Sequence, residues 1–161
     1  MGTTTRQRNT SGRRQSLLRT LFNRPAMISS PPARITVTVL ILAGAVLTVL
    51  SGLVHLKLWG GDTGYHTIPT IGPLFLVQAI SGVAIGLAMA VSRRLFFVLA
   101  GVGLLVGTAL GLYITIQYGL FNFQENWGAP YAKSSFIEEI VGAVVLLAAA
   151  IPLAMARGSK N

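Results

Sequence analysis

The chain contains no cysteine among its 161 residues and very few acidic side chains. The lack of cysteine excludes disulfide bonds and thiolate metal sites. Four Asp and Glu stand against thirteen Lys and Arg, and only 11% of the residues are charged, whereas a typical soluble domain has about 25%. This shortage of charge excludes an ordinary soluble domain and predicts an integral membrane protein with one compact domain.

Recognisable catalytic motifs are also lacking. The sequence contains no G-x-S-x-G, no H-E-x-x-H and no phosphate-binding loop, the short patterns of serine hydrolases, zinc proteases and P-loop NTPases. The chain therefore gives little reason to expect an enzyme. Its two histidines, His55 and His66, and its few acids are the side chains to follow.

Four long apolar segments dominate the rest of the sequence. Each has roughly the 20 mostly apolar residues that a membrane-spanning helix needs. The first is rich in Val, Ile and Thr, but a lone strand cannot satisfy its backbone in lipid, so a helix is expected there too. We predict an all-α four-transmembrane-helix bundle within residues 35–156, between a basic tail (1–34) and a short C-terminal tail (157–161). The predicted spans cover about residues 35–56, 71–91, 95–118 and 136–155.

The distribution of Lys and Arg predicts the orientation of this bundle. Eleven of the thirteen cations lie in the two tails or in the link between the second and third spans, and only Lys57 and Lys133 lie in the other loops. Because short cytoplasmic loops collect Lys and Arg, we expect both termini in the cytoplasm and loops 57–70 and 119–135 outside it, in a multi-pass protein of the cell membrane. Five aromatic residues of these loops and span ends are expected to form an interfacial belt: Trp59, Tyr65, Tyr118, Trp127 and Tyr131.

The net charge of +9 comes largely from the N-terminal tail, which holds seven arginines. A partner nucleic acid is not expected, because a basic tail next to a first span is typical of a segment retained in the cytoplasm. Leu17, Leu18, Leu21 and Phe22 are spaced roughly as on a helix among these arginines. The tail therefore either lies on anionic lipid as an amphipathic helix or is largely disordered.

Glycines at steps of four mark expected contact faces between helices. Gly82 and Gly86 share one face of the second span, and Gly103, Gly107 and Gly111 share one face of the third. Small residues let helices approach closely in lipid, where packing rather than hydrophobic drive holds them together. We expect these faces to pack inside the bundle. The alternative is that one of them receives another subunit.

Polar residues gather where the spans meet the two predicted outer loops. Buried polar side chains in a membrane usually face the bundle interior, so we expect His55, Gln78, Gln117 and one of Glu138 and Glu139 to form a polar pocket. Glu138 follows Ser135 by three residues, as in a capping box at a helix start. Glu139 is then the one that points inward. Asp62 and His66 fall in the first loop, where simple loop polarity explains them.

A metal site is a more specific interpretation of three of these residues than a polar pocket. His55, His66 and Glu139 supply three N or O ligands, the usual number for zinc or copper together with water. The spacing of the histidines, however, matches no established ligand motif. A haem held by both histidines is not expected, because only His55 lies in a span. No cofactor is required by the sequence.

Three stretches resemble a group of small four-span membrane proteins common in actinobacteria. They are "SGLVHLKLW", "GYHTIPTIGPLFLVQAISG" and "FIEEIVGAVVLL", and the resemblance covers roughly residues 50–150. In that group a His ends the first span, another His lies in the outer loop and a Glu opens the fourth span. The resemblance therefore implies the four-span fold and singles out His55, His66, Gln78 and Glu139, but it implies no reaction.

Three functions fit these observations. The first is a non-catalytic accessory subunit of a larger membrane complex, because the chain is small, rich in glycine and without a catalytic motif. The second is a metal- or small-ligand-binding protein that uses the outer pocket. The third is an oligomeric small transporter, which would need polar residues through the full depth of the membrane, and the inner halves of the spans offer only Thr, Ser and Gly.

Overall fold

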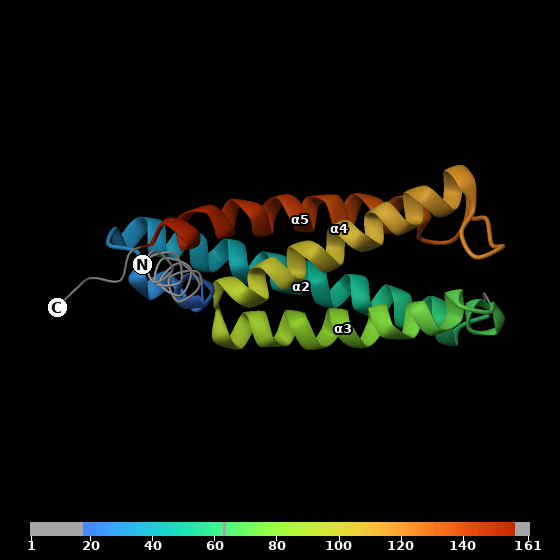
Figure 1. The fold of residues 1–161 in the computed structure, drawn as a ribbon, viewed down its shortest axis with the longest axis horizontal. Coiled ribbons are helices and arrows are strands. Elements are labelled where there is room, and N and C mark those ends of the chain that lie inside the picture. Colours follow the sequence, from blue (N-terminus) through green and yellow to red (C-terminus); the bar gives the residue numbers. More distant parts are fainter. Residues whose placement is uncertain (1–17, 63, 157–161) are drawn as a thin grey trace, which may run out of the picture.

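The computed structural model describes residues 18–62 and 64–156, and it is built of helices (Figure 1). Among these residues, four helices are long and apolar enough to cross a membrane. The predicted all-α four-helix fold is confirmed. The long helices are α2 (Pro31–Gly60), α3 (Ile71–Ser92), α4 (Leu95–Tyr118) and α5 (Ala132–Met155), and the short 3-10 helices are η1 (Pro25–Met27) and η2 (Tyr65–Thr67).

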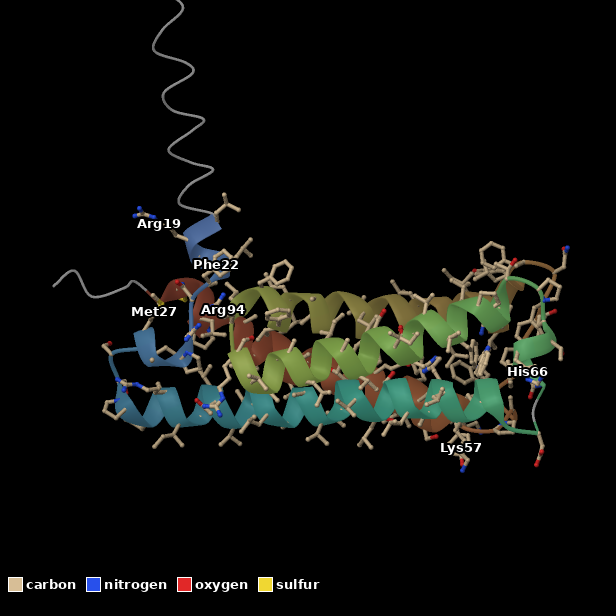
Figure 2. The ribbon with its side chains drawn as sticks, turned by 90° about the horizontal axis from the view of Figure 1, so that it is seen from below. Arg19, Phe22, Met27, Lys57, His66 and Arg94 are labelled. Carbon is tan, nitrogen blue, oxygen red and sulfur yellow. The ribbon has the colours of Figure 1, made fainter. Side chains whose placement is uncertain are left out.

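The helices run up and down, which places the connections at two opposite ends (Figure 1). We call the end with residues 61–70 and 119–131 the loop end, and the end with residues 18–30 and 93–94 the tail end. Figure 2 shows His66 and Lys57 toward the loop end, and Arg19, Phe22, Met27 and Arg94 at the tail end. All four acidic residues belong to the loop end or to the adjoining part of α5.

Two helices extend beyond the predicted spans. α2 begins at Pro31 rather than at residue 35, because prolines fit the first helical turn, where a missing N–H costs nothing. It ends at Gly60, beyond the predicted residue 56. α5 begins at Ala132, four residues before the predicted start. Pro152 does not stop α5, which continues to Met155.

Helices α2 and α3 make the closest contact in the bundle. An added Cβ at Gly82 would lie 2.9 Å from the Cα of Gly52 and 2.9 Å from the carbonyl oxygen of Thr48. An added Cβ at Gly86 would lie 2.9 Å from the carbonyl oxygen of Ala45. Only glycine permits this approach of two backbones, so the predicted packing role of Gly82 and Gly86 is confirmed.

Leu146 of α5 anchors the middle of the bundle and is fully buried. Added Cβ atoms at Gly44 of α2 and Gly101 of α4 would collide with its side chain, at 2.2 and 2.9 Å. Around it, an apolar core fills the tail half of the bundle with side chains from all four long helices. This core holds the tail half closed. Its buried members are Val37, Ile41, Ala45, Met89, Leu95, Val98, Leu105, Ala143, Leu146, Ala149, Ala150 and Leu153.

The predicted packing of Gly103, Gly107 and Gly111 inside the bundle is wrong. An added Cβ at any of the three would meet no atom within 4 Å. The buried face of α4 instead carries Gly101 and Leu105. Two positions along a helix turn its face by about 200°, so glycines offset by two from the packed residues point to the open side.

Helix α4 leans across the bundle, and this tilt creates the open side. It starts beside α3 at the tail end and ends beside α5 at the loop end (Figure 1). The space between α3 and α4 therefore widens toward the loop end, where the functional residues lie.

Candidate functional site

A cavity of about 360 Å³ occupies the loop half of the bundle. Its volume falls in the range of roughly 300–1,000 Å³ that is typical of small-molecule sites. α3 and α4 form its side walls, α2 and α5 form its back, and the two loops cover its end. The lining is mostly apolar, with polar groups from each of these parts: His55, Gln78, Thr108, Thr115, Glu125, Tyr131, Ser135 and Glu139.

The cavity opens sideways between α3 and α4. Leu74 and Val77 on the α3 rim are 45% and 59% exposed, and Gly103 and Gly107 on the α4 rim are also exposed. These residues lie within helices that are long and apolar enough to cross a membrane. In a bilayer this opening faces lipid rather than water.

Glu139 is the most deeply buried polar group at the back of the cavity, with no exposed surface. The hydroxyl of Ser51 donates a hydrogen bond to its Oε1 over 3.2 Å. Its other oxygen, Oε2, is buried and has no hydrogen-bond partner among the described residues. The predicted inward position of Glu139 is confirmed, and half of its carboxyl group is left without a protein partner.

His55 lies one turn after Ser51 on the same face of α2 and is also buried. Its Nδ1 donates a hydrogen bond to the carbonyl oxygen of Ser51 over 2.8 Å. In a neutral imidazole this leaves Nε2 as the acceptor. Its ring packs against Phe75 of α3, with ring centroids 5.0 Å apart. Ser51 thus ties the histidine and the glutamate to one turn of α2.

Gln78 supplies the third polar group, from the α3 wall. It is half-buried and lines the cavity, and its amide nitrogen Nε2 has no hydrogen-bond partner among the described residues. A buried polar group without a partner costs about 1–3 kcal/mol. Two such groups, on Gln78 and Glu139, are therefore placed where a molecule in the cavity could satisfy them.

An aromatic roof, made of Tyr65, Phe75 and Phe123, covers the loop end of the cavity. Tyr65 stacks on Phe75 with centroids 4.8 Å apart and meets the edge of Phe123 at 5.9 Å. Tyr65 is buried rather than part of an interfacial belt, so that prediction is wrong for this residue. The roof covers part of the loop end, where Pro130 and Tyr131, which also line the cavity, are exposed.

A hydrogen bond between the two loops holds the roof in place. The hydroxyl of Tyr65 donates to Oε2 of Glu125, whose Oε1 accepts from the backbone N–H of Asn126. Burial, the hydrogen bond to Glu125 and the charge of that carboxyl all raise the pKa of Tyr65, burial most strongly. Tyr65 therefore stays protonated and remains a donor at neutral pH.

The three predicted metal ligands do not come together. His66 is exposed, does not line the cavity, and donates from Nδ1 to the carbonyl oxygen of Trp59 over 2.9 Å. Within residues 18–62 and 64–156, no group of three or more His, Asp and Glu could hold a metal ion. The His55, His66 and Glu139 site is therefore not formed. Asp62 is exposed in the loop, as expected for simple loop polarity.

Two other predictions for the polar pocket are also wrong. Gln117 is exposed and does not line the cavity, because it lies near the end of α4, where a long polar side chain can reach out of the bundle. Glu138 does not cap α5, since the helix already begins at Ala132, six residues before it. Its Oε1 is buried without a partner, but Glu138 does not line the cavity.

Sequence reasoning missed Ser51 as a partner and Glu125 as a lining residue. Ser51 precedes His55 by four positions, so helical spacing places both on one face. That signal was available in the sequence. The pairing of Glu125 with Tyr65 joins two loops that are 60 positions apart, and no local pattern predicts it.

The charges around the cavity are unbalanced. Of the described residues that line it, Glu125 and Glu139 are acidic and none is a lysine or an arginine. Lys57 lies nearby, but its Nζ donates to the hydroxyl of Tyr131 over 2.6 Å and lies 5.0 Å from the centre of that ring. The site can bind through hydrogen bonds, apolar contact and its two carboxyl groups.

No protein-family model, no curated protein and no solved structure matches this chain. The resemblance to the four-span actinobacterial group therefore stays a prediction.

Proposed function

We propose that this integral membrane protein binds a small, largely apolar molecule in the cavity at the loop end and is not an enzyme. One observation carries the proposal: two residues that line an apolar cavity each have a buried polar atom, Glu139 Oε2 and Gln78 Nε2, with no hydrogen-bond partner within residues 18–62 and 64–156. A ligand with a polar group would satisfy them, and its apolar part would fill the remaining volume.

The tail half of the bundle supports binding rather than transport. The buried apolar core there draws side chains from all four long helices. A solute path through the membrane needs polar residues at that depth. The oligomeric transporter therefore remains the weakest of the three predicted functions, and a binding or sensing role fits better.

The proposal is tested by identifying what the protein carries. The wild-type chain and the Gly107→Phe variant are purified in mild detergent, and solvent extracts are compared by mass spectrometry. An added Cβ at Gly107 would meet no atom of the described residues within 4 Å, and Gly107 lines the cavity, so a larger side chain begins in open space at the cavity wall. We expect a compound close to one per chain in the wild type and its loss from the variant. Identical extracts that reflect only bulk membrane lipid would contradict the proposal.

The accessory subunit remains a second candidate, favoured by the exposed glycine face of α4. Gly103 and Gly107 are exposed and uncovered, and small residues on a lipid-facing surface allow close contact with another helix. Since the chain has no cysteine, Gly103→Cys gives a unique site for crosslinking in native membranes. A specific adduct with a second protein would support this candidate. Labelling by lipid-soluble reagents alone would argue against it.

A further inference from the structure

We infer that the cavity is built for a lipophilic amine, which reaches it sideways from the bilayer. This inference rests on the proposed binding function and adds the chemical class of the ligand. Its nitrogen would be placed at Glu139 and its apolar body along the open side between α3 and α4.

The carboxyl group of Glu139 is the feature that selects an amine. It is fully buried in a span, and its Oε2 lacks a partner among the described residues. Ionised groups within a membrane are costly unless an opposite charge pairs with them. A protonated amine both pairs with the carboxylate and donates a hydrogen bond to Oε2, which a neutral or acidic ligand cannot do together.

The rest of the lining also favours a cation over an anion. No lysine or arginine is among the described residues that line the cavity, and a second carboxyl group, that of Glu125, lies at the roof. The roof is aromatic, and ring faces attract cations. An anionic head group would meet two carboxyl groups, whereas Lys57, a cation next to the lining residue Tyr131, already donates to the hydroxyl of that tyrosine. Two carboxyl groups and no cation thus make the site selective by charge.

The shape of the cavity selects a membrane-soluble molecule. Tyr65, Phe75 and Phe123 pack over the end that faces the loops, whereas the rims on α3 and α4 are exposed. A molecule already dissolved in the bilayer therefore has a direct route to the cavity. The absence of side chains at Gly103 and Gly107 keeps that route wide.

The test uses three probes that differ only in their polar group: dodecylamine, dodecanol and dodecanoate. Saturable binding of each radiolabelled probe is measured with the full chain in phosphatidylcholine nanodiscs, and empty nanodiscs give the background. We expect dodecylamine to bind at least roughly tenfold more tightly than dodecanol, because both probes can donate a hydrogen bond to Oε2 but only the protonated amine brings the opposite charge. Dodecanoate should bind most weakly.

Two matched variants locate the effect. Glu139→Gln keeps the size of the side chain and removes its charge, and it should abolish the preference for dodecylamine over dodecanol. Glu138→Gln makes the same change at the neighbouring position, which does not line the cavity, and should leave the preference intact. Melting temperatures close to that of the wild type show that each variant is folded.

The failures of the two proposals are distinguishable. If dodecanol or dodecanoate binds the wild type as tightly as dodecylamine, and Gly107→Phe removes that binding, the cavity binds ligands but the amine inference is overturned. An unchanged dodecylamine preference in folded Glu139→Gln overturns it in the same way. If no probe binds the wild type saturably, the amine inference fails whatever the extracts of the purified protein contain. A compound retained by the wild type and lost from Gly107→Phe would then still support the binding function.

Discussion

At the residue scale, Asn23 connects three segments at the tail end. Its side-chain nitrogen donates to the carbonyl oxygens of Leu153 and Ala156, over 2.8 and 2.9 Å. Its own carbonyl oxygen accepts from the backbone N–H of Leu95, over 3.0 Å. These bonds satisfy backbone groups that the end of α5 and the start of α4 leave without helical partners. A single buried amide thus fastens the segment before the first span to the bundle.

We predict that Asn23→Ala lowers the free energy of unfolding by about 1–3 kcal/mol, the cost of leaving buried polar groups without a partner. Asn23→Asp should be at least as damaging, because it keeps the shape but replaces the donor with an acceptor. Gln117→Ala, at an exposed position, should change stability by no more than about 0.5 kcal/mol. Thermal unfolding in detergent measures all three. Equal melting temperatures for Asn23→Ala and Gln117→Ala would contradict this role of Asn23.

Tyr65 predicts how stability depends on alkaline pH. Its pKa is raised above the ordinary value of 10.0, first by burial and then by Glu125. A group with a higher pKa in the folded state contributes its full stability below its unfolded pKa and loses it as the pH rises further. We therefore expect the wild type to lose stability above about pH 10, and Tyr65→Phe to lose less. Parallel curves of melting temperature against pH would count against this. Tyr118→Phe, at an 81% exposed position, is the matched control.

The sequence predicts some of these residues and not others, for a physical reason. The cost of an acid in lipid requires that Glu139 face inward, and the structure places it there. Gln117 obeys no such requirement, because the end of a helix lets its side chain reach outward. His66 has the right chemistry for a ligand, but its loop directs it to the surface.

At the element scale, two glycines in equivalent sequence patterns have opposite surroundings. Gly82 faces the backbone of α2, and Gly107 faces open space. We predict that Gly82→Ala destabilises the protein by about 1–3 kcal/mol, because α2 and α3 must move apart. Gly107→Ala should be neutral or stabilising by roughly 0.5–1 kcal/mol, since Ala is the better helix former. Thermal unfolding of the pair measures the difference, and an equal loss of stability in both variants would show that α4 is also packed at Gly107.

This contrast shows what the spacing of glycines does and does not predict. Because residues four apart lie on the same side of a helix, the spacing correctly predicts that the glycines of α3 share one face and that those of α4 share another. It does not predict which neighbour each face meets, because that depends on the tilt of α4 relative to α3 (Figure 1). The existence of the four helices follows from apolar length, whereas the cavity follows from a tilt that no local pattern encodes.

At the scale of the whole molecule, the two ends differ sharply in charge. The acids lie toward the loop end, and Arg19, Arg24, Arg34, Arg93 and Arg94 lie toward the tail end. We predict that the tail end faces the cytoplasm. In cells that express single-cysteine variants, Gly128→Cys should react with a membrane-impermeant maleimide from outside, and Thr3→Cys only after permeabilisation. Position 3 lies outside the described residues and serves only as a marker of sidedness. The reverse labelling pattern would contradict this orientation.

The N-terminal tail adds an expected contact with lipid at the same end. Leu18 and Phe22 are 57% and 54% exposed beside Arg19, and residues 18–21 are helical, whereas Leu17 lies outside the described residues. Exposed apolar and basic side chains together are typical of a segment on an anionic membrane surface. The interaction of this segment with anionic lipid stays a prediction.

The most direct measurement is a crystal structure of the protein grown in a lipidic mesophase, without added ligand and after addition of dodecylamine. We predict that α3 and α4 stay apart at the loop end, and that non-protein density fills the space between them. With the amine present, that density should approach Glu139 Oε2 to within about 3 Å, a hydrogen-bond distance. A cavity closed by direct contact of α3 with α4, or filled by a helix of another chain against Gly103 and Gly107, would contradict a ligand pocket.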